Sequence, residues 1–103
     1  MSREDRRWGL GPEARTRLGA RVMARRLRAG MSRTGLCSRA AVSGHRLALL
    51  EGGKAGASLD VWVRIAGALG VSLDDLLAGV RWVPAEPDPN PGEGSYVVGR
   101  GTA

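Results

Sequence analysis

The side chains best suited to contact another molecule lie in a short stretch that begins at Ser43. His45 and Arg46 follow this serine and can donate hydrogen bonds, and Arg46 also carries a positive charge. Leu47 and Leu50 lie on one side of a helix at this spacing, so that side would be buried. The opposite side would present Gly44, His45, Arg46, Ala48 and Leu49. Such a face suits binding to a polar or negatively charged surface rather than covalent chemistry.

The sequence offers no set of residues that would support catalysis or hold a metal ion. His45 is the only histidine and Cys37 the only cysteine, whereas a metal site needs several such ligands. No acid or base can be assigned as a catalytic partner of His45. Cys37 follows Leu36 on the apolar side of a predicted helix, where we expect a small core residue. We therefore predict a protein that is not an enzyme and that uses no metal or cofactor.

Positive charge is concentrated in the first third of the chain. The net charge is +6, from fifteen arginines and one lysine against ten acidic residues, and nine of the arginines lie within residues 1–30. This imbalance favours a polyanionic partner such as nucleic acid, and the alternative is a solvated arginine surface.

The composition also restricts the class of protein and its location. A length of 103 residues allows one small domain with tails, and the absence of Phe makes the core aliphatic. No apolar run approaches the roughly 20 residues of a membrane span, and the first residues contain no secretory signal. One cysteine suits a reducing compartment. We expect a cytoplasmic protein that makes no membrane contact.

The periodicity of apolar residues predicts an all-α domain of five short helices. Serines at 32, 43, 58 and 72 are placed as N-caps, and Gly30 as a C-terminal stop with positive φ. The expected helices cover residues 15–29, 33–40, 44–51, 59–69 and 73–78. The second and third form two helices joined by a tight turn, with Val42 buried in the turn.

Composition divides the chain into three parts. Residues 1–14 are expected to form a flexible basic arm, and residues 15–83 the helical domain. Four of the five prolines lie within residues 84–94, so we expect residues 84–103 to form a mostly disordered Pro/Gly-rich tail.

Residues 18–79 resemble the DNA-binding domain of the lambdoid phage repressor and Cro family, also called the xenobiotic-response-element (XRE) family. The matching residues are RRLRAGMS (25–32), Leu36, AAVS (40–43), Leu47, Leu50, Glu51, Gly53 and SLDVWVRIAGALGVSLDDLLAG (58–79). The resemblance implies a lambda-repressor-like fold of five helices with a helix-turn-helix. It also implies a homodimer on a two-fold operator, with the third helix in the major groove of double-stranded DNA.

Carried over by position, the resemblance assigns roles to individual residues. Base-reading positions are occupied by Ser43, Gly44, His45, Arg46 and Leu49. Phosphate contacts are expected from Arg33, Lys54, Gly53 and Arg26. Arg26 and Glu51 also occupy positions that often form an ion pair in the family. Gly44 lacks a side chain to read a base, and Ala41 stands where the family usually has a glycine in the turn.

The sequence thus predicts a sequence-specific DNA-binding regulator of transcription, of the repressor type, located on the nucleoid. Three alternatives remain open. Arg46 would contact a phosphate, which we favour, or only solvent rather than a base, and His45 would be an ordinary surface residue. The whole domain would instead be a protein-interaction module of the same fold, an antitoxin or adaptor, with a protein partner bound through the C-terminal tail.

Overall fold

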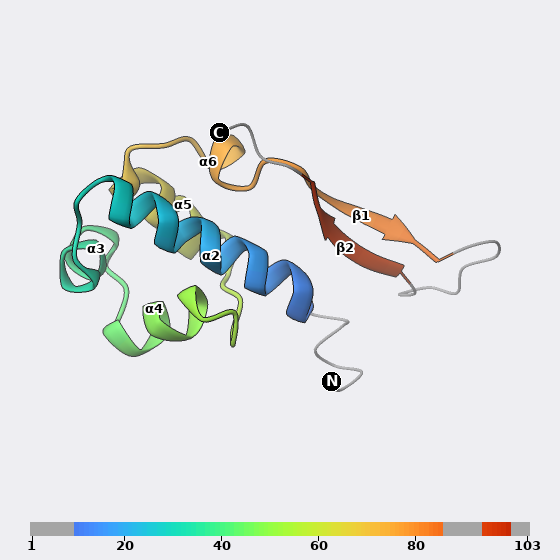
Figure 1. Cartoon of the computed structure of the whole chain (residues 1–103), viewed down its shortest axis with the longest axis horizontal. Helices are drawn as coiled ribbons and strands as arrows, with labels where there is room; N and C mark the ends of the chain where they lie inside the picture. Colours follow the sequence, from blue (N-terminus) through green and yellow to red (C-terminus); the bar gives the residue numbers. More distant parts are fainter. Residues whose placement is uncertain (1–9, 86–93, 100–103) are drawn as a thin grey trace.

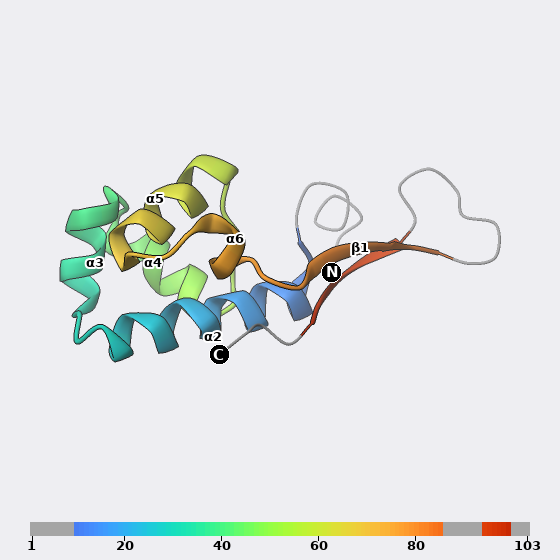
Figure 2. The same cartoon turned by 90° about the horizontal axis from the view of Figure 1, so that it is seen from above.

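The computed structural model describes residues 10–85 and 94–99, which form five helices followed by two strands. They are α2 (Pro12–Arg28), α3 (Arg33–Ala40), α4 (Gly44–Glu51), α5 (Leu59–Leu69), α6 (Leu73–Leu76), β1 (Val80–Pro84) and β2 (Gly94–Val98). The predicted third helix is thus α4. Figures 1 and 2 show α2 crossing the domain, with α3 and α4 on one side and the β1–β2 hairpin extending from the other end.

Three of the four predicted serine caps are present. The hydroxyl oxygens of Ser32, Ser43 and Ser72 accept hydrogen bonds from backbone N–H groups three residues later, at 3.0, 3.1 and 3.0 Å. These bonds satisfy N–H groups that have no partner inside the helix. Ser58 also occupies the N-cap position of α5, as predicted, but it makes no capping bond, because its hydroxyl donates to the carboxylate of Asp60.

Three predicted helix boundaries differ from the structure, and the smallest difference is at the end of the first helix, which is Arg28 rather than Ala29. The first helix begins at Pro12 rather than Arg15, because a proline at the first helical position needs no N–H partner and has a helical φ. Ala14 is buried, so the flexible arm predicted for residues 1–14 is wrong from Pro12 onward, and residues 1–9 lie outside the described residues. The last helix ends at Leu76 rather than at residue 78.

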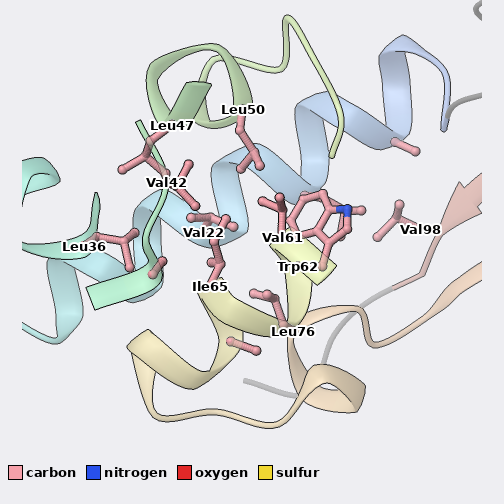
Figure 3. Packing of buried hydrophobic residues seen from close by; sticks show 14 residues of the cluster. Val22, Leu36, Val42, Leu47, Leu50, Val61, Trp62, Ile65, Leu76 and Val98 are labelled. Carbon is pink, nitrogen blue, oxygen red and sulfur yellow. The ribbon is translucent and has the colours of Figure 1, made fainter. Parts of the chain in front are cut away.

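A single hydrophobic core joins all five helices (Figure 3), and it is aliphatic as predicted except for Trp62. Its largest fully buried side chains are Leu18, Val22, Leu36, Leu47, Leu50, Ile65 and Leu76. Each contributes on the order of 1.5–3 kcal/mol by leaving water, which holds together helices too short to be stable alone. Among the described residues, no helix is both long and apolar enough to span a membrane.

The prediction of an all-α domain with a disordered tail over residues 84–103 is wrong for Gly94–Val98. These residues form β2, which pairs antiparallel with β1 so that Val80 faces Val98 and Trp82 faces Tyr96. Trp82 and Tyr96 pack edge to face with their centroids 5.1 Å apart, and Val98 is buried against the helices. Pro84 occupies the end of β1, where a proline leaves the strand pairing intact, and the other three prolines on which the prediction rested lie outside the described residues.

The arginines of α2 have a structural role that the charge analysis did not predict. Arg17 donates to the carbonyl of Val98 at 3.0 Å, and Arg25 lies 2.9 Å from the carboxylate of Asp75. Between them, Arg21 donates to the carbonyls of Leu76 and Ala78, at 2.8 and 2.9 Å. These cations follow each other at one-turn spacing and attach α6 and the hairpin to α2. Their positive charge is therefore not evidence for a polyanionic partner.

We predict that Arg21→Met lowers the free energy of unfolding by about 2 kcal/mol, because two carbonyls at the end of α6 lose a charged donor. Methionine keeps most of the apolar stem, so the loss reports the hydrogen bonds. Thermal unfolding followed by circular dichroism measures it. The matched control is Arg28→Met on the exposed side of the same helix. Equal melting temperatures for the two variants would contradict the assignment.

Candidate nucleic-acid interface

The helix-turn-helix is formed by α3, the turn at residues 41–43 and α4. Ala41 adopts the left-handed conformation with φ 55°, which reverses the chain within one residue. Val42 is buried in the turn as predicted, and its N–H donates to the carbonyl of Cys37 at 3.1 Å. The turn therefore fixes the direction in which α4 leaves α3.

One side of α4 is packed into the core and the other is open to solvent. Leu47 and Leu50 are fully buried. Ser43, Gly44, His45, Arg46 and Ala48 are exposed, and Leu49 is half-buried. The hydroxyl of Ser43 already accepts the N–H of Arg46, so it is left with its own proton to donate. The predicted base-reading positions are thus together on one accessible surface, with Leu49 at its margin.

The C-terminal end of α4 is fixed to α2 by a buried ion pair. Arg26 donates twice to the carboxylate of Glu51, from Nε to Oε2 at 2.7 Å and from Nη2 to Oε1 at 3.1 Å. Its Nη1 donates to the carbonyl of Met31 at 2.9 Å, and Arg26 and Glu51 are only 7% and 5% exposed. The hydrogen bond to Glu51 raises the pKa of Arg26, although burial opposes this shift. The structure thus contains the pair expected from the resemblance.

These contacts correct one predicted role of Arg26. All three of its guanidinium nitrogens are engaged within the domain, and the side chain is buried. A phosphate group has no access to it, so Arg26 is a structural residue and not a phosphate contact.

Two glycines let α2 and α4 approach each other more closely than other residues would allow. A β-carbon at Gly19 would collide with the carbonyl oxygen of Leu50, and one at Gly53 would lie 2.7 Å from Cα of Thr16. Gly53 is buried with φ 72°, and its N–H donates to the carbonyl of Leu50 at 3.1 Å. The phosphate contact predicted for Gly53 is therefore wrong. The small size of this residue serves a close approach to α2 instead.

The role of Gly19 was not predicted from the sequence. The available signal was a glycine inside a helical apolar pattern, which usually marks a close contact.

Basic side chains flank the open side of α4. Arg33 lies 3.6 Å from the carboxylate of Glu51 but remains 56% exposed, and Lys54 is exposed directly beyond the helix. Glu51 is the only acidic residue between positions 31 and 57, and it is buried, whereas the same segment contains Arg33, Arg39, Arg46 and Lys54. The surface contributed by the helix-turn-helix is therefore positive.

Known proteins share both the sequence pattern and the fold. The family described as "Helix-turn-helix domain" matches residues 17–78, more than half of the chain. A comparison with curated protein sequences gives no match.

Similar solved structures extend over the helical part of the chain. The clp gene regulator ClgR from Corynebacterium glutamicum is 31% identical with a TM-score of 0.60, over 62% of this chain and 68% of ClgR. The competence regulator ComR from Streptococcus vestibularis is 35% identical with a TM-score of 0.59, over 62% of this chain but only 22% of ComR. The restriction-modification controller protein C.AhdI from Aeromonas hydrophila is 22% identical with a TM-score of 0.59, over 60% of this chain and 94% of C.AhdI. At that identity the likeness to C.AhdI is one of fold.

We predict that Glu51→Gln lowers the free energy of unfolding by about 3–5 kcal/mol, because Arg26 would keep its charge in a buried site without a counter-charge. Chemical denaturation gives this value. The matched control is Glu13→Gln, which removes the exposed Glu13–Arg17 pair at 3.8 Å and should cost less than about 1 kcal/mol. A small effect of Glu51→Gln would show that the pair does not hold α4.

Ala41→Gly should stabilise the protein by about 0.5–1 kcal/mol. The left-handed conformation costs a residue with a β-carbon roughly 1–2 kcal/mol, and glycine avoids this cost. The greater conformational entropy that glycine loses on folding offsets only part of this stabilisation. Ala24→Gly, in the exposed middle of α2, should instead destabilise by about 1 kcal/mol. Shifts of the same sign in the two melting temperatures would contradict this account.

Proposed function

Because this chain belongs to the helix-turn-helix domain family, of the lambdoid phage repressor and Cro type, we propose that it regulates transcription by binding operator DNA as a homodimer with α4 in the major groove. Binding alone would block or recruit the polymerase, with no chemistry on the DNA, and would place the protein on the nucleoid of the cytoplasm. Half-sites would lie about 34 Å apart, one turn of the double helix.

The observation that carries this proposal is the division of α4 into a buried and an open side. Its buried leucines and the pair between Arg26 and Glu51 attach the helix to the domain, and the cap at Ser43 stabilises its first turn. Its open side presents polar and basic side chains together with the bare backbone of Gly44. A fixed helix with one free face has the shape that the major groove accepts.

Within this proposal the residues divide into two groups. His45 and Arg46, in the first turn of α4, read base edges, and Arg46 is suited to a bidentate bond with guanine. Ser43 and Gly44 lie at the same end, and half-buried Leu49 offers an apolar contact to a thymine methyl group. Arg33 and Lys54 contact phosphates, which supply most of the affinity and its dependence on salt. Since Gly44 and Leu49 provide no hydrogen bonds from their side chains, DNA shape adds to the specificity.

The test begins by selecting the preferred sequence from a random duplex library, followed by fluorescence anisotropy titrations at several salt concentrations. Arg46→Gln should weaken binding to the selected duplex by about 1–3 kcal/mol and relax the preference at one base position. Lys54→Gln should weaken binding to all sequences alike and reduce the slope of log K against log salt by about 1. The control Arg81→Gln removes the same charge from the exposed hairpin, at the far end from α4 (Figure 1), and should bind as the wild type does.

Equal affinity of the wild-type chain for selected and scrambled duplexes would contradict a sequence-specific regulator. A stoichiometric protein partner from the native host that is retained by the Arg33, Arg46 and Lys54 variants would instead favour the antitoxin or adaptor alternative.

A further inference from the structure

The helix α5 has an apolar side that the described residues of the chain leave exposed. Its inner residues Val61, Trp62, Ile65 and Ala66 are buried in the core. On the outer side Leu59 is 65% exposed and Val63 49% exposed, one turn apart. Gly67 follows one turn later, and a β-carbon built there would meet no atom within 4 Å. Figure 2 shows α5 along an outer edge of the helical body.

The same side of α5 carries one acidic and one basic residue. The carboxylate of Asp60 lies 3.7 Å from the guanidinium of Arg64, and the side chains are 72% and 45% exposed, respectively. The hydrogen bond from Ser58 lowers the pKa of Asp60, so this residue is a carboxylate near neutral pH. The outer side of α5 thus combines an apolar stripe with opposite charges at nearby positions.

We propose that this face, formed by Leu59, Asp60, Val63, Arg64 and Gly67, is the surface through which two copies of the chain pair antiparallel about a two-fold axis. The inference rests on the proposed function, because it names the interface of the homodimer proposed there. A two-fold contact uses the same patch on both copies, so the patch must be complementary to itself.

The spacing along α5 meets this condition when Val63 lies on the axis. Leu59 precedes Val63 by four residues and Gly67 follows it by four, which is about 6 Å in each direction. In an antiparallel pair, Leu59 of one copy therefore lies level with Gly67 of the other, where the missing side chain leaves room for it. Val63 meets its own equivalent.

The charges fit the same arrangement. Asp60 lies three residues before the axis, and Arg64 lies one residue after it. Because the second copy runs in the opposite direction, its Arg64 is level with the position one residue before the axis in the first copy. Asp60 of one copy and Arg64 of the other are thus offset by two residues, or about 3 Å along the helix. An arginine side chain easily spans this offset. Each copy would thus contribute one acidic and one basic group to two equivalent ion pairs at the rim, which fix the antiparallel direction.

The size of the face predicts a weak dimer in free solution. One side of three helical turns buries less than the roughly 1,200–2,000 Å² of stable complexes. Dimerisation would then be strengthened on DNA, where two adjacent half-sites hold the copies at high effective concentration.

The decisive variant is Gly67→Gln, tested by sedimentation of the full chain up to about 1 mM, a concentration that detects even very weak pairing. Glutamine favours a helix more than glycine and enters open space in the monomer, so the melting temperature should be unchanged or higher. In the dimer it would occupy the place of Leu59 from the other copy. We expect the dimer dissociation constant to rise at least about tenfold, a change of 1.4 kcal/mol in binding free energy.

Two further comparisons test the apolar contact and the charges separately. Leu59→Ser should weaken the dimer, whereas Leu27→Ser, at the equally exposed leucine of α2, should not. Asp60→Arg should weaken it by like-charge repulsion, and the exchange Asp60→Arg with Arg64→Asp should restore it to within about threefold.

Three results would overturn the proposal: a wild-type chain that stays monomeric throughout, a Gly67→Gln variant that dimerises like the wild type, or equal effects of the two leucine substitutions. Binding of the wild type to a duplex with a single half-site is measured in parallel. Salt-dependent binding there together with any of these three results would reject the α5 interface and retain DNA binding through α4.

Discussion

The attachment of α4 to α2 is the constraint on which the rest of the structure depends. A helix of eight residues is unstable in water by itself, so its position must come from its neighbours. The buried pair of Arg26 and Glu51 fixes the orientation of α4 against α2, because all three guanidinium nitrogens and both carboxylate oxygens form hydrogen bonds. Gly19 and Gly53 allow the two helices to pack closely, because any side chain at these positions would push them apart. Charge and close packing therefore act together to present one face of α4.

Arginine serves two distinct purposes in this chain. On α2, Arg17 donates to the carbonyl of Val98 in the hairpin, Arg21 donates to the carbonyls of Leu76 and Ala78 at the end of α6, and Arg25 pairs with the carboxylate of Asp75. In the helix-turn-helix, Arg33 and Arg46 remain exposed next to α4. Net charge alone does not separate these groups, because solvent exposure and the nearest acceptor decide what each cation does.

The two proposed contacts place different demands on two neighbouring helices. The open side of α4 is polar and basic, as suits a charged double helix. The open side of α5 is apolar with balanced charges, as suits a second protein surface. Because both helices pack on one core, a dimer through α5 would set the spacing between the two α4 helices. The affinity for DNA would then depend on the geometry of the α5 pair as well as on the bases read.

The sequence by itself determined the features that depend on neighbouring residues. Ser32 and Ser43 start α3 and α4 through bonds to N–H groups three residues away, and the apolar spacing gave the bounds of α3, α4 and α5 as the structure has them. The family followed from the same stretches, so the fold of the helix-turn-helix was predictable. Only the tertiary structure decided which glycines permit close approach, which arginines are buried, and that residues 94–98 form a strand. These features join residues far apart in the chain, 81 positions for Arg17 and Val98 and 55 for Arg21 and Leu76. The pair of Arg26 and Glu51, 25 positions apart, could be expected only from the family resemblance. Local periodicity carries no information about such partners, because packing in three dimensions selects them.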